Sequence, residues 1–223
     1  MEIYSKGQVQ AVTVILLTGL TVGVASVVYV WGQPILDKRD SEVQLDSVEK
    51  NILDLRQEII RVSEGGEGAA SEISMDLEED DYEVRMIQVN ESNDYVDIIV
   101  DADESPYPDG RWTMLKGDTM QNLSITSGDY AIKGEDLGSV LMVRPQSSII
   151  RYRMEFRNLY SQASGTSLEK VDLQTVGGGI SSGETDMYIR NGGSQLDSGQ
   201  DGLTISTGQT LDRRRTQVEV DLR

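Results

Sequence analysis

The first strong pattern along the chain is a long uncharged stretch near the N-terminus. No residue from Gly7 to Leu36 is charged, and the apolar part of this stretch runs from Ala11 to Trp31. A helix needs about 20 apolar residues to cross the hydrocarbon core of a bilayer. Tyr29 and Trp31 lie at the far end, where aromatic rings favour the membrane interface. The pattern predicts a membrane-inserting helix over residues 8–36.

Two glycines four positions apart lie inside this stretch. Gly19 and Gly23 form a GxxxG motif, with Thr18 and Ser26 among the small residues near it. Small residues at this spacing let two helix backbones approach closely in a membrane. The motif favours helix–helix packing, although small residues are also common in membrane helices that pack against nothing.

A second helical pattern follows, over residues 37–63. Its apolar residues recur at alternating spacings of three and four, which is typical of one helix face. These residues, called the seam below, are Leu45, Val48, Ile52, Leu55, Ile59 and Val62. The seam can pair with another helix or lie on the chain's own head, and its short length favours the head. Pro34 predicts a kink or an interruption between the two helical parts.

After a glycine-rich hinge predicted at residues 64–72, the pattern changes to period two over residues 73–223. In residues 150–157 apolar and charged side chains alternate strictly, and residues 217–222 alternate likewise. Further strands are predicted at Glu83–Val89, Tyr95–Val100, Ser139–Val143, Val171–Val176, Asp186–Arg190 and Leu203–Thr207. Turns are predicted at 108–110, 177–179 and 191–193. The expected fold is α+β, with an antiparallel β-sandwich-like or barrel-like head.

Composition narrows the chemistry that is available. The chain has no cysteine and no histidine, which excludes disulfides, thiolate or histidine metal sites and Ser-His-Asp catalysis. Its net charge is −18, with 38 acidic residues against 20 basic ones, so a nucleic-acid partner is not expected. The same acidity fits either an adaptation to high salt or an ordinary solvated exterior.

Weaker motifs add little chemistry. The acidic runs at residues 76–81 and 101–104 lack the spacing of a calcium loop, so we interpret them as solvated surface and expect no metal or cofactor. The arginines in residues 212–215 are expected to pair with that acidic surface. Asn90 and Asn122 each begin an N-x-[ST] sequon, a candidate glycosylation site on an extracellular head.

The order of these parts carries a resemblance. Lys6 and Gly7 stand directly before Gln8, where the uncharged helix begins, and an amphipathic extension and a β-rich head follow. This order resembles the archaeal type IV pilin-like proteins, whose class III signal peptide is cut after the glycine. The resemblance implies a leader of residues 1–7, with Lys6 supplying the charge before the cut and Gln8 as the first mature residue.

The resemblance further implies a filament whose core is the apolar helix. Its partners are copies of the same chain, the prepilin peptidase and the pilus assembly machinery, with the membrane holding the precursor. Val12 stands where many pilins carry a glutamate, so pairing of that glutamate with a neighbour's amino terminus is not available. The helix composition also argues against an archaellin.

The expected function is therefore that of a structural, non-catalytic subunit of an archaeal type IV-like surface pilus, used for adhesion. One alternative is a single-pass membrane-anchored binding or adhesion protein that does not polymerise. A second is an anchored enzyme that uses carboxylates, although no acidic pair stands out from the acidic background.

Overall fold

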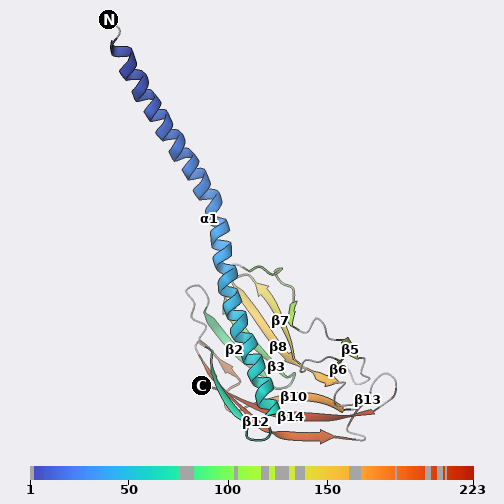
Figure 1. Cartoon of the computed structure of the whole chain (residues 1–223). Helices are drawn as coiled ribbons and strands as arrows, with labels where there is room; N and C mark the ends of the chain where they lie inside the picture. Colours follow the sequence, from blue (N-terminus) through green and yellow to red (C-terminus); the bar gives the residue numbers. More distant parts are fainter. Residues whose placement is uncertain are drawn as a thin grey trace. The chain divides into compact units, whose positions relative to one another are not determined.

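The computed structural model describes most of the chain. The described residues are 3–75, 83–102, 105–116, 121–123, 131–133, 139–160, 167–183, 185–198, 202–204, 208 and 210–223. Within them the chain forms one long helix, α1 (Ile3–Glu64), followed by fourteen strands (Figure 1). The strands are β1 (Ala70–Ser74), β2 (Val84–Asn90), β3 (Tyr95–Asp101), β4 (Thr113–Lys116), β5 (Gln121–Leu123), β6 (Ala131–Lys133), β7 (Ser139–Gln146), β8 (Ile149–Phe156), β9 (Asn158–Tyr160), β10 (Ser167–Thr175), β11 (Ile180–Ser181), β12 (Asp186–Asp197), β13 (Leu203–Thr204) and β14 (Thr210–Leu222). The α+β class is confirmed.

The helix is not interrupted at Pro34, where the sequence predicts either a kink or an interruption. Proline lacks the N–H that would bond to the carbonyl four residues earlier, which here belongs to Val30. Even so, the helical conformation continues through Pro34.

The chain divides into two compact units, Met1–Val43 and Gln44–Arg223. The boundary lies inside α1, so the second unit, called the head unit below, holds about the last six turns of the helix together with the strands. The sequence-based boundary placed the head at residue 73. The predicted hinge at 64–72 is a short turn, because β1 already begins at Ala70.

Inside the head unit the seam of α1 is completely enclosed. Its six residues are at most 2 % exposed: Leu45, Val48, Ile52, Leu55, Ile59 and Val62. They belong to one apolar cluster with residues of the strands, so the seam packs on the chain's own head. Each fully buried aliphatic side chain contributes about 1.5–3 kcal/mol from the hydrophobic effect, which makes the seam a substantial part of the head's stability.

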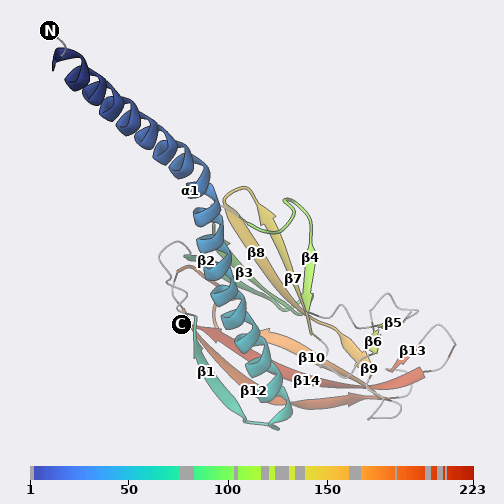
Figure 2. The ribbon, with the colours of Figure 1, turned by 45° about the horizontal axis from the view of Figure 1, so that its top comes forward.

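The strands form two sheets (Figure 2). The large sheet has the order β1-β12-β14-β10-β9-β6-β5, with β13 paired to β14, and the small sheet has the order β11-β2-β3-β8-β7-β4. Most pairs are antiparallel, but β10 runs parallel to β14, and β6 runs parallel to β9. The antiparallel pairing predicted from the sequence is therefore confirmed for most of the head, and these two parallel pairs, which join strands distant in the sequence, are the exceptions.

The main core lies between α1 and the two sheets. The small sheet contributes residues such as Ile98 and Tyr152, and the large sheet contributes residues such as Ile189 and Val218. On β8 the burial alternates as predicted, with Ile150, Tyr152, Met154 and Phe156 buried. The period-two pattern thus identifies the core face of this strand correctly.

One predicted turn is instead the middle of a strand. Asn191, Gly192 and Gly193 lie within β12, which extends to Asp197. The register with β14 shifts between Asn191 and Gly193, as in a β-bulge. Gly193 has a φ of +113°, a conformation that favours glycine. The glycines therefore mark a bulge and not a chain reversal.

Candidate functional site

The first candidate functional feature is the apolar part of α1 in the first unit. Thr13–Gln33 is long and apolar enough to cross a membrane, and none of it is buried by the rest of the chain. Large apolar side chains are exposed along it, among them Leu16, Leu20 and Val28. A contiguous apolar surface of this size marks contact with a membrane or with another protein.

Three hydroxyl groups within this apolar segment are bonded to its own backbone. The hydroxyls of Thr18, Thr21 and Ser26 donate to the carbonyl oxygens four residues earlier, at 2.8, 2.6 and 2.8 Å. In lipid no water is present to satisfy such groups, so an internal acceptor removes most of the cost of placing them there. The segment therefore suits an apolar environment in its polar residues as well as its apolar ones.

The two glycines of the predicted packing motif have free space beside them. A Cβ atom added at Gly19 or Gly23 would meet no atom of the chain within 4 Å. These positions therefore leave room for the close approach of another helix, as the motif requires. Lys6, Gly7 and Gln8, the predicted cleavage site, also belong to α1, but their side chains lie outside the described part of the chain.

The second candidate feature is the polar attachment of α1 to the head unit. At the first buried turn, the Glu49 carboxylate accepts hydrogen bonds from the hydroxyls of Tyr107 at 2.6 Å and Tyr152 at 3.4 Å. Burial raises the pKa of Glu49, and the two tyrosine hydrogen bonds reduce this rise without cancelling it. One turn beyond Ile52, Arg56 donates from Nε to the Ser139 hydroxyl at 2.6 Å and thereby joins α1 to β7.

At its C-terminal end the helix is capped by a side chain from the middle of β12. Asn191 is fully buried, and its Nδ2 donates to the carbonyl oxygens of Val62 at 3.1 Å and Ser63 at 3.0 Å. Its Oδ1 accepts the backbone N–H of Gly193 at 2.8 Å. The last carbonyls of a helix have no partner within the helix, so Asn191 supplies what the helix end lacks. The bulge aims this side chain at the helix.

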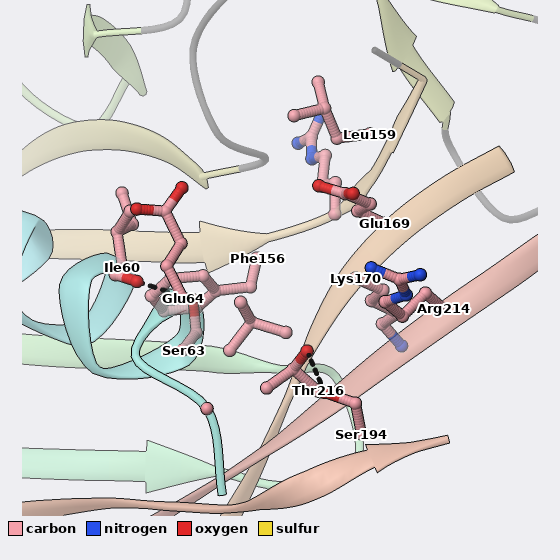
Figure 3. Close-up of a pocket in the computed structure, with 13 residues that line it drawn as sticks. Ile60, Ser63, Glu64, Phe156, Leu159, Glu169, Lys170, Ser194, Arg214 and Thr216 are labelled. Carbon is pink, nitrogen blue, oxygen red and sulfur yellow. Dashed lines mark hydrogen bonds between the residues drawn. The ribbon is translucent and has the colours of Figure 1, made fainter. Parts of the chain in front are cut away.

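A pocket of about 450 Å³ lies beside this capped end (Figure 3). Its wall combines apolar side chains, such as Phe156 and Leu159, with charged ones of both signs. Glu169 and Arg214 are register partners on the parallel strands β10 and β14. The hydroxyls of Ser194 and Thr216 bond to each other at 3.0 Å. A wall of this mixed kind is suited to binding contacts.

The two asparagines of the predicted glycosylation sequons lie on strands of the head unit. Asn90 ends β2, where its Nδ2 donates to the Tyr95 hydroxyl at 3.2 Å and its Oδ1 accepts the Asn93 N–H at 3.0 Å. Asn122 lies in β5, and its side chain is outside the described part of the chain.

The arginines of residues 212–215 pair with neighbouring strands. Arg213 and Arg215 bind Asp197 at 3.0 and 2.6 Å, and Arg215 also lies 3.2 Å from Asp172. Within the acidic run at 101–104, Asp101 pairs with Arg85, and the run at 76–81 lies outside the described residues. Among the described residues, no group of three acidic side chains is arranged to hold a metal ion.

Comparison of the chain with protein-family models, curated proteins and solved structures gives no significant match in any of the three. The function is therefore inferred from the exposed apolar helix, its attachment and the head unit themselves.

Proposed function

We propose that this protein is a structural subunit of an archaeal type IV-like surface pilus. It is cut after Gly7 by a prepilin peptidase, and Gln8 becomes the first residue of the mature chain. The apolar helix holds the precursor in the membrane and then becomes the core of a helical filament made of copies of the chain. It acts by assembly and adhesion, with no catalysis and no nucleic-acid partner.

The observation that carries this proposal is the contrast between the two parts of α1. The seam of α1 is occupied by the chain's own head, whereas every residue of Thr13–Gln33 except Gly32 is exposed. An apolar helix of this kind satisfies its own backbone in lipid and equally in a bundle of helices. A head–tail interface between copies that does not close on itself produces an open filament.

The head also supports the proposal, because its shared core would hold the outer surface of each subunit in one conformation. We propose a sandwich-like head in which the two sheets and the buried seam share one core, so that each subunit presents the same outer surface in the filament. Asn191, Arg56 and Glu49 join the helix to that core by hydrogen bonds, so a force on the helix is transmitted to the sheets.

The N-terminus of assembled material tests the processing step. Filaments are sheared from cells, and the intact mass and N-terminal peptide of the subunit are measured by mass spectrometry. We expect a chain that starts at Gln8. A chain that starts at Met1 in assembled filaments would contradict the proposal.

The alternative of a single-pass anchored surface protein has one observation in its favour. Three hydroxyls of the span, those of Thr18, Thr21 and Ser26, are satisfied by its own backbone, so these groups need no neighbouring helix in lipid. Replacing Gly19 and Gly23 with leucine separates the two functions. The filament proposal predicts that membrane insertion persists while filaments disappear from electron micrographs. Filaments of normal number and length in this variant would remove the role of the motif.

A further inference from the structure

The outer face of the small sheet carries a group of arginines. The strands β3, β8, β7 and β4 lie side by side in this order (Figure 2). On β8 the side chain of Tyr152 faces the core, so Arg151 and Arg153, at the alternate positions, lie on the opposite face. Arg144 of β7 is the register partner of Arg151, and Asp97 of β3 is the register partner of Arg153. These three arginines and Asp97 are called the arginine cluster below.

The arginine cluster holds more positive charge than its one carboxylate can neutralise. Asp97 is 1 % exposed and accepts two hydrogen bonds from Arg153, at 2.7 and 2.8 Å. Arg151 reaches the same carboxylate only at 3.5 Å. The half-buried side chain of Arg144 has neither an ion pair nor a hydrogen bond within the described part of the chain. Two of the three guanidinium groups therefore have a weak counter-ion or none among the described residues.

The neighbouring carboxylates of this face are bound to other arginines. Glu155 accepts two hydrogen bonds from Arg157, at 2.8 and 3.0 Å, and Asp101 lies 2.7 Å from Arg85. Like charges directly opposite each other on adjacent strands destabilise a sheet, and the register partners on β7 and β8 are both arginines. An anionic group supplied from outside the chain would therefore stabilise this face.

Exposed apolar side chains border the arginine cluster at the edge of the sheet. The guanidinium carbons of Arg144 and Arg153 lie 5.8 and 5.1 Å from the centre of the Trp112 ring, within the range of cation–π contacts. Trp112 is 38 % exposed, and Met114 of the edge strand β4 is 45 % exposed. Interfaces between proteins are enriched in tryptophan, methionine and arginine, so this face has the composition of a protein-binding surface.

Another copy of the chain has the charge that complements the arginine cluster. The net charge of the chain is −18, with 38 acidic residues. Asp46 and Asp54, for example, are exposed on α1 and have no ion pair among the described residues. A positive face on a strongly acidic protein is therefore attracted to the remaining surface of a second copy. In the proposed filament a second copy lies beside every head.

We propose that the arginine cluster, with Trp112 and Met114, is a docking surface for an acidic segment on the head of a second copy of this chain. Arg144 and Arg151 bind the carboxylates of that segment, and a guanidinium can donate two parallel hydrogen bonds to one carboxylate. The two surfaces that meet are different, so the contact can repeat from one subunit to the next. This inference rests on the proposed function, for which it names a contact between heads.

Photo-cross-linking from Met114 tests the docking surface. The chain has no cysteine, so Met114→Cys introduces a single thiol that can be labelled with a benzophenone in filaments sheared from cells. After illumination we expect a dimer of twice the chain mass that resists sodium dodecyl sulfate. Mass spectrometry should place the cross-link in a head peptide of the second copy that contains aspartate or glutamate. A label that reacts only within its own chain, with lipid or with a different macromolecule would overturn the proposal.

Charge reversal tests the role of the arginines in the same labelled chain. Arg144→Glu places a carboxylate against the carboxylates of the partner and should lower the dimer yield at least about tenfold. Arg190→Glu makes the same change at an exposed position of β12 in the large sheet and should give the yield of the parent. Equal yields from the two variants would overturn the proposal. If Arg144→Glu fails to fold, Arg144→Gln, which removes the charge alone, should lower the yield in the same direction, and an unchanged yield would overturn the proposal.

Electron micrographs of the same cells separate this inference from the pilus proposal. Normal filaments that give no dimer from Met114→Cys would overturn the docking surface and leave the pilus proposal intact. Dimers formed through the acidic head peptide in membranes of cells without filaments would support the docking surface and contradict the pilus proposal.

Discussion

The cap supplied by Asn191 is expected to be one of the main determinants of how firmly α1 is held by the head unit. The substitution Asn191→Asp keeps the volume of the side chain and removes both hydrogen bonds that Nδ2 donates to the helix end. It also places a negative charge beside the negative end of the helix dipole. Packing is unchanged, so the measured effect reports the cap and not a cavity.

The size of the stability loss in Asn191→Asp depends on which hydrogen-bond donors remain for the Val62 and Ser63 carbonyls. The Val62 carbonyl still accepts the Gly65 N–H at 3.2 Å, whereas Asn191 Nδ2 is the donor that the structure gives to the Ser63 carbonyl. A lost net hydrogen bond costs about 1 kcal/mol, and a buried acceptor left without a partner costs about 1–3 kcal/mol. Together these give a loss of about 2–4 kcal/mol in the free energy of unfolding at pH 7.

Urea unfolding of the full chain in micelles measures this loss. A Trp31→Phe background leaves Trp112 in the head unit as the single tryptophan reporter. Gln195→Glu makes the same amide-to-carboxylate change at an exposed position of the same strand and should stay within about 0.5 kcal/mol of the parent.

Acid provides an internal check on the mechanism. Once the introduced carboxyl of Asn191→Asp is protonated, it can donate one hydrogen bond to the helix end and no longer opposes the dipole. The stability gap between this variant and the parent should therefore narrow as the pH falls. A gap that equals that of Gln195→Glu, or one that does not narrow in acid, would refute the capping argument.

Three further predictions concern the head unit. Ile52→Ala, in the buried seam, should lower the free energy of unfolding by about 2–5 kcal/mol, and the exposed neighbour Lys50→Ala should change it by less than about 0.5 kcal/mol in the same urea assay. Burial raises the pKa of Glu49, so the folded head binds a proton more readily than the unfolded chain and loses stability as the pH rises above the usual pKa of 4.5. Glu49→Gln should flatten the pH dependence of the urea midpoint above pH 4.5, and an unchanged pH profile in this variant would contradict the argument. Hydrogen bonding to Arg215, opposed by burial but aided by Arg213, lowers the pKa of Asp197. The stability that this carboxylate contributes is therefore complete above the usual pKa of 3.8 and is lost as the pH falls through the lowered pKa. Asp197→Asn should lower the free energy of unfolding at pH 7 and flatten its fall in acid, and a fall in acid parallel to that of the parent would argue against the ion pairs.

The sequence by itself determined the features that depend on near neighbours. The apolar stretch, the seam of α1 and the alternation on β8 are all visible because helical and strand periodicity are local properties. The prediction that the seam packs on the chain's own head is also confirmed. A run of six buried positions is too short for a stable free coiled coil, and the structure places it on the sheets.

The tertiary structure alone decided the features that join distant parts of the chain. The parallel pairing of β10 with β14 and the cap that Asn191 gives to Ser63, 128 positions earlier, leave no periodic signal. The glycines after Asn191 read as a turn, because a bulge and a turn both need the backbone freedom of glycine. The pocket beside the capped end of α1 likewise joins residues of β8, β9, β10, β12 and β14. Residues become a site only when long-range strand pairing brings them together, and that pairing is set by the packing of the whole head and not by any local stretch.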